Sequence, residues 1–146
     1  LYLWASALRM IGDHPFLGVG LDNFLYQYPQ YMFPEAWQEP NISHPHNIML
    51  DFWARIGILG VAAMGWLQWD FWRRGWRLWN ATLPRPQRSL VLALMAVMID
   101  TLVHGLIDNS FFLIDLATIF WFTYGLMLIL EQISSRTPAL SAEGTQ

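Results

Sequence analysis

Three long apolar segments constrain this sequence of 146 residues more than any other feature does. They run over residues 47–69, 90–107 and 111–130, and each is close to the roughly 20 residues that a helix needs to cross about 30 Å of hydrocarbon. Strands are excluded, because an open sheet would leave backbone groups without partners in lipid. The chain is 55% hydrophobic and only 13% charged, which is typical of a membrane protein. The sequence therefore predicts an all-α membrane bundle with three transmembrane helices.

The arginines predict how these helices are oriented. The chain has no lysine, and five of its eight arginines lie between the first and second apolar segments: Arg73, Arg74, Arg77, Arg85 and Arg88. Short arginine-rich loops stay in the cytoplasm, so residues 70–89 are predicted as a cytoplasmic loop. Residues 1–45 are then an extracytoplasmic loop segment, and the polar residues 131–146 a disordered cytoplasmic tail. We expect a multi-pass protein of the inner (cytoplasmic) membrane with its functional site outside the cytoplasm.

The extracytoplasmic segment is aromatic and interrupted by prolines. Its stretch FLYQYPQYMFPEAW, residues 24–37, fits an interfacial belt at the headgroup level, and a surface on which sugars stack is the alternative. The sequence starts at Leu1 without a basic and apolar leader, so we expect an internal or C-terminal piece of a longer protein. Without cysteine, neither a disulfide nor a thiolate metal site is possible.

Charged and small residues within the apolar segments predict how the helices pack. Asp51 and Arg55 are four residues apart and can pair along one helix face. Asp100 on the second helix lies at a similar depth, so we predict a structural pair between Arg55 and Asp100, in competition with Asp51. Gly57 and Gly60 are predicted to let another helix approach closely.

A ring of polar residues is predicted at the outer mouth of the bundle. Its members are His44, His46, Asn47, His104, Asp108, Asn109 and Asp115. His104 fits a hydrogen-bonded core residue, whereas His44 and His46 with a carboxylate could hold a metal, although this spacing is weak evidence. A third interpretation is an outward-facing site in which His46 accepts a proton or binds an anion, because the ordinary histidine pKa of about 6.5 makes both forms accessible.

Three parts of the sequence resemble the O-antigen ligase and polymerase family. His46-Asn47, nine further residues and Gly57-x-x-Gly60 resemble its His-Asn-x9-Gly-x-x-Gly signature. Upstream, residues 1–24, above all HPFLGVGLDNF, resemble the segment that precedes this signature, and residues 104–126 resemble the last helix pair of the family. The resemblance covers about residues 1–130.

The resemblance implies an integral-membrane glycosyltransferase. Members pass a glycan from a polyprenyl-diphosphate carrier to a hydroxyl on lipid A core, another glycan or a protein, so no nucleotide sugar, metal or nucleic acid is expected. It implies that His46 is the family's functional histidine, and we expect this residue to be catalytic. From their place in the polar ring we also expect Asn47, His44 and Asp108 to bind substrate, with the membrane lipids as further partners. Arg9 does not match the family's functional arginine, which would precede Leu1.

Several functions remain open at this point. The acceptor is not determined, so the enzyme could be a ligase, a polysaccharide polymerase or a protein O-oligosaccharyltransferase. A non-enzymatic module of a transporter is the alternative from another class. Such a module should carry polar groups through the bilayer, whereas the third apolar segment contains only Asp115 as a charged residue.

Overall fold

The structure, a computed structural model, describes residues 2–36, 41–108, 111–112 and 114–143, with the backbone alone at 114–115 and 136–143. All regular secondary structure in these residues is helical, which confirms the predicted class. The elements are α1 (Tyr2–Asp13), α2 (Phe24–Tyr31), a 3-10 turn (Pro34–Ala36), α3 (Ile48–Ile56), α4 (Ile58–Trp79), α5 (Arg85–Ile107) and α6 (Ile114–Glu143).

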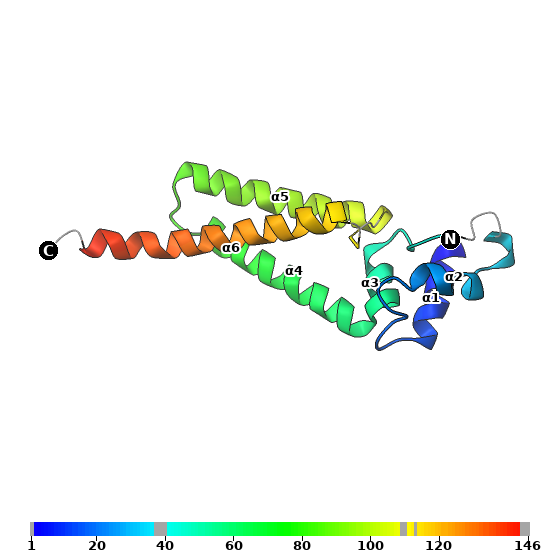
Figure 1. Cartoon of the computed structure of the whole chain (residues 1–146). Helices are drawn as coiled ribbons and strands as arrows, with labels where there is room; N and C mark the ends of the chain where they lie inside the picture. Colours follow the sequence, from blue (N-terminus) through cyan, green and yellow to red (C-terminus); the bar gives the residue numbers. More distant parts are fainter. Residues whose placement is uncertain (1, 37–40, 109–110, 113, 144–146) are drawn as a thin grey trace.

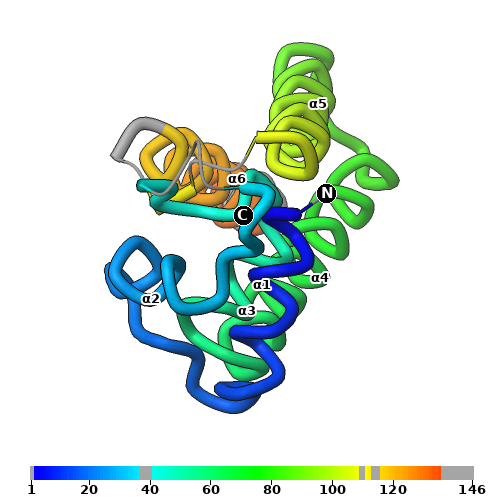
Figure 2. Tube along the Cα trace, turned by 90° about the vertical axis from the view of Figure 1, so that its right-hand side faces the viewer, coloured from blue at the N-terminus to red at the C-terminus, as the bar shows by residue number. Residues whose placement is uncertain are grey.

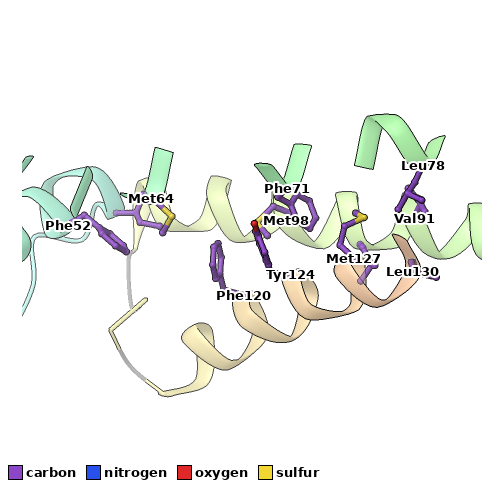
Figure 3. Close-up of a cluster of buried hydrophobic side chains, with 12 residues drawn as sticks. Phe52, Met64, Phe71, Leu78, Val91, Met98, Phe120, Tyr124, Met127 and Leu130 are labelled. Carbon is purple, nitrogen blue, oxygen red and sulfur yellow. The ribbon is translucent and has the colours of Figure 1, made fainter. Parts of the chain in front are cut away.

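The helices form two packed groups that share α3. The long helices α4, α5 and α6 run side by side, and the short helices α1, α2 and α3 gather at one end of them (Figures 1 and 2). The core between the long helices is aromatic and rich in methionine; it includes Phe71 of α4, Met98 of α5 and Phe120 of α6 (Figure 3). Phe52 of α3 packs against the same core.

A second core joins the short helices. Met10 of α1 and Phe24 and Tyr28 of α2 are fully buried, and Ala54 of α3 packs against them. Helix α3 therefore presents Phe52 to the long bundle and Ala54 to the short helices. This double contact fixes α3, and the predicted functional residues His46 and Asn47 directly precede this helix.

The first predicted span, residues 47–69, is not one helix. Gly57 ends α3 and begins α4 with a φ of 76° and a ψ of −166°, a conformation that side chains rarely adopt. A Cβ at Gly57 would lie 2.1 Å from the carbonyl oxygen of Phe16. The predicted role of Gly57 as a helix-packing residue is thus wrong, because this glycine makes a sharp break that lets a distant loop approach. Gly60 is buried on α4, where a Cβ would lie 2.6 Å from Cβ of Ile56.

The other two predicted spans correspond to long apolar helices. Among the described residues, two helices can cross a membrane by length and composition, Arg85–Ile107 and Leu116–Ser135. Helix α4 continues to Trp79, so much of the predicted loop 70–89 is helical and the connection to α5 is only residues 80–84. Helix α6 likewise continues to Glu143 through the segment predicted as a disordered tail.

Candidate functional site

The candidate site lies where the segment before α3 meets the end of α5. His46 Nδ1 lies 2.8 Å from Asp108 Oδ1, although the two residues are 62 positions apart in the sequence. The ring of His44 packs beside that of His46 with their centroids 4.3 Å apart, and His44 Nε2 lies 3.6 Å from the same Asp108 oxygen. The structure thus brings together three members of the predicted ring, His44, His46 and Asp108.

The backbone at His46 is unusual. Its φ is 51°, and among the described residues no other non-glycine residue has a positive φ. Such a conformation is uncommon and costs energy that the surroundings must offset. Two contacts hold it on either side, since Trp4 Nε1 donates to the carbonyl of Pro45 at 2.9 Å and the Asn47 side chain accepts from the backbone at the start of α3. Strain of this kind is concentrated at functional sites.

The end of α5 is docked onto the start of α3, and this brings Asp108 to His46. Asn47 Nδ2 donates to the carbonyl of Leu106 at 3.1 Å, while Asn47 Oδ1 caps α3. At Gly105 a Cβ would lie 3.2 Å from Ile48, so the small residue permits this close approach. Sequence reasoning missed the positioning residues Trp4 and Gly105. For Gly105, the only signal in the sequence was its position as a glycine one helical turn before Asp108.

Arg55 anchors the segment that precedes the histidines. It is buried, and it donates to Asp51 Oδ1 and to the carbonyl of Ser43, both at 2.6 Å, and also to the carbonyl of Leu21. The predicted pair between Arg55 and Asp100 is wrong, because the Arg55 side chain points to these loops whereas Asp100 lies on an exposed face of α5.

The buried face of α5 contains neither Asp100 nor His104, the two polar residues that were predicted to lie inside the bundle. The residues that α5 buries are Val91, Leu94, Met98, Thr101 and Gly105. This stripe turns Asp100 and His104 outward, so His104 is not the core residue that the sequence predicted. Asn109 and the side chain of Asp115, the remaining predicted members of the ring, lie outside the described residues.

The glycine-rich loop before α2 packs against the end of α3. The amide of Val19 donates to the carbonyl of Ala54 at 2.8 Å, and the amide of Ile58 donates to the carbonyl of Pro15 at 2.9 Å. Gly18 has a φ of 66°, and a Cβ there would lie 2.5 Å from the carbonyl carbon of Arg55. The loop therefore depends on glycine at Gly18 and Gly57 for its contact with α3.

The electrostatics of the site favour a charged Asp108 and a neutral His44. The hydrogen bond from His46 holds the pKa of Asp108 below its ordinary value, with a smaller contribution from His44. Burial lowers the pKa of His44, and the neighbouring His46 lowers it further. Because an ionised carboxylate only accepts hydrogen bonds, His46 Nδ1 must be the donor. Its Nε2 is then the nitrogen that can accept a proton.

The same three side chains could also bind a metal ion. One ligand atom from each of His44, His46 and Asp108 lies within 4.8 Å of the other two. His44 Nε2 is buried without a hydrogen-bond partner in the described structure. Two imidazoles and a carboxylate are a donor set that suits zinc, so the geometry fits both a hydrogen-bonded pair and a metal site.

Residues 1–65 match the O-antigen ligase family. The match includes α1, α2, α3 and His46 and ends within α4, so it confirms the resemblance over this part of the chain. No curated protein and no solved structure matches the chain. Together with the two long apolar helices, the family match indicates a membrane protein.

Proposed function

We propose that this protein transfers a glycan from a polyprenyl-diphosphate carrier to an acceptor hydroxyl at the outer face of the cytoplasmic membrane, as an O-antigen ligase-like glycosyltransferase. The observation that carries the proposal is the 2.8 Å contact between His46 and Asp108. It joins the histidine of the matched region to a carboxylate from outside that region, and a carboxylate in this position can orient a histidine that acts as a general base. The five arginines at the end of α4 and the start of α5 support the orientation.

In the proposed reaction His46 activates the acceptor. The acceptor oxygen attacks the anomeric carbon, its proton passes to His46 Nε2, and the bond from that carbon to the diphosphate oxygen breaks. The carrier leaves as polyprenyl diphosphate. Asp108 accepts a hydrogen bond from His46 Nδ1 and stabilises the imidazolium that forms, as a carboxylate does in other histidine-based sites.

The negative charge on the leaving diphosphate needs a cation, and arginine suits phosphate oxygens best. Arg55 is the arginine nearest to the histidines along the chain, but its donors already bind Asp51 and two backbone carbonyls. We therefore assign Arg55 to positioning the loop and not to the diphosphate. His44 and Asn47 line the acceptor side in this proposal.

The test compares His46→Ala with His14→Ala in protein purified from membranes. His14 is exposed, and only its backbone makes a hydrogen bond in the described structure, so it is a matched control. We expect His46→Ala to lower the rate of transfer from a polyprenyl-diphosphate glycan by about 10²-fold or more, with donor binding retained. Transfer by His46→Ala at the rate of His14→Ala would contradict the proposal.

The acceptor is tested separately, by the surface glycans of cells that lack the protein. Loss of attachment with normal chain length would support a ligase. Short chains that remain attached would instead support a polymerase.

A further inference from the structure

An open pocket of about 650 Å³ lies at the connection between α4 and α5, lined by residues 79–84 and Arg88. This connection is at the end of the long bundle opposite α1, α2 and α3 (Figure 1). It is therefore far from the pair of His46 and Asp108, and an inference about it does not rest on the proposed function.

The sequence around this pocket is strongly basic. No acidic residue occurs between Asp70 and Asp100, whereas the interval contains five arginines. Three of these arginines have acidic partners: Arg73 and Arg74 contact Asp70, and Arg74 and Arg77 contact Glu131 of α6.

The other two arginines remain available. In the part of the chain that the structure describes, neither Arg85 nor Arg88 contacts a carboxylate. The guanidinium of Arg88 lies over the ring of Trp79, 4.1 Å from its centroid. A cation held on an aromatic ring keeps its orientation while its donors stay free. Arg88 is thus a positive group on the wall of the pocket, and it has no negative partner among the residues that the structure describes.

The position of the pocket along α5 favours a lipid as the ligand. Helix α5 begins at Arg85 and is long and apolar enough to cross a membrane. The first turn of such a helix lies at the headgroup level. Trp76, which is 65% exposed, precedes the pocket on α4, and exposed tryptophan is typical of this interface.

We propose that this pocket binds the phosphate group of an anionic phospholipid, with Arg88 as its principal contact. The ligand chemistry is a phosphodiester at the membrane surface. Arg88 supplies the charge and hydrogen-bond donors, and Trp79 orients the guanidinium and borders the glycerol backbone.

The experiment uses the purified full chain in neutral detergent and counts bound lipid by mass spectrometry of the intact complex. The probes are phosphatidylglycerol and phosphatidylcholine with the same acyl chains. The variants are Arg88→Gln and, as a matched control, Arg9→Gln, because Arg9 also lies over an aromatic ring, 3.8 Å from the centroid of Phe33. Both variants remove one charge and one cation–aromatic contact.

We expect the wild-type chain to prefer phosphatidylglycerol. Arg88→Gln should weaken phosphatidylglycerol binding about fivefold with phosphatidylcholine binding unchanged, and Arg9→Gln should bind as wild type does. Circular dichroism and thermal unfolding of Arg88→Gln should match those of the wild-type chain, since the Arg88 side chain is exposed.

Three results would overturn the proposal. The first is equal binding of the two lipids by the wild-type chain. The second is an equal loss in Arg88→Gln and Arg9→Gln, which would show a response to net charge alone. The third is displacement of phosphatidylglycerol by millimolar inorganic phosphate, which would assign the pocket to a free anion.

Discussion

Arg55→Met tests whether one buried arginine holds the loops that form the candidate site. The replacement keeps a long side chain but removes every hydrogen-bond donor. Arg55 has a side chain that is 8% exposed, and it joins Asp51 of α3 to the backbone of two separate loops, at Leu21 and Ser43. The variant therefore removes the side-chain hydrogen bonds that join α3 to both of these loops.

The size of the effect follows from these contacts. A hydrogen bond to a charged group contributes about 1.5–3 kcal/mol and one to a neutral carbonyl about 1 kcal/mol. With one carboxylate and two carbonyls losing a donor, we expect the free energy of unfolding to fall by about 3–5 kcal/mol, which agrees with the usual effect of breaking a buried pair. The matched control is Arg73→Met. The Arg73 side chain is 47% exposed and bonds Asp70 at 3.1 Å, so its loss should cost less than about 1 kcal/mol.

The assay is reversible unfolding in neutral-detergent micelles, followed by circular dichroism, together with amide hydrogen exchange. In Arg55→Met exchange should accelerate at residues 18–23 and 43–47, whereas α4, α5 and α6 should keep their protection. Unfolding free energies of Arg55→Met and Arg73→Met within 1 kcal/mol of each other would refute the reasoning, as would unchanged exchange in both loops.

Three further changes test other parts of the site. If the proposed function holds, Asp108→Asn should lower the single-turnover transfer rate by about 10²-fold with little change in KM, because an amide stabilises the imidazolium of His46 less than a carboxylate does; an unchanged rate would remove Asp108 from the mechanism. Gly57→Ala should lower the unfolding free energy by about 2 kcal/mol or more, since its φ is 76° and the new Cβ would lie 2.1 Å from the Phe16 carbonyl oxygen; wild-type stability in chemical denaturation would count against the break at α3. Because burial lowers the pKa of His44 from 6.5, the unfolded chain takes up a proton below pH 6.5 that the folded chain does not, so stability should fall as pH decreases from 7 to 5. His44→Gln should flatten this slope, and an equally steep slope in the variant would contradict the burial of His44.

The sequence predicted the long helices α5 and α6 better than the segment 47–69, which the structure divides at Gly57 into α3 and α4. Apolar runs of about 20 residues were sufficient to locate α5 and most of α6, because length and hydropathy are local properties. The break at Gly57 was missed, since the residues around it are as apolar as a continuous helix would be. What determines the break is the backbone of Phe16, which approaches from 41 positions earlier and occupies the space that a side chain would need.

The residues of the candidate site were predicted from the sequence, but their arrangement in space was not. His44, His46 and Asp108 were all named from sequence, yet Asp100 and His104 of the same helix were expected inside the bundle. The face that α5 buries is marked instead by Val91, Met98 and Gly105. Hydropathy could not locate this face, because the exposed side of α5 is also apolar, for example at Val97, Ile99 and Val103, and lipid gives no hydrophobic preference between two apolar faces. Spacing along one helix also carries no information about a contact with another segment.

The distance between His46 and Asp108 depends on both halves of the molecule. His46 is fixed by the short helices, through Trp4, whereas Asp108 is fixed by the core that α5 shares with α4 and α6. Helix α3 connects the two, since Asn47 caps it and also bonds Leu106 of α5. A slip of α5 by one turn would move Asp108 by about 5.4 Å and abolish a 2.8 Å contact. Residues 1–65, which match the O-antigen ligase family, therefore supply only the histidine of the pair, and the packing of the long bundle decides whether the carboxylate reaches it.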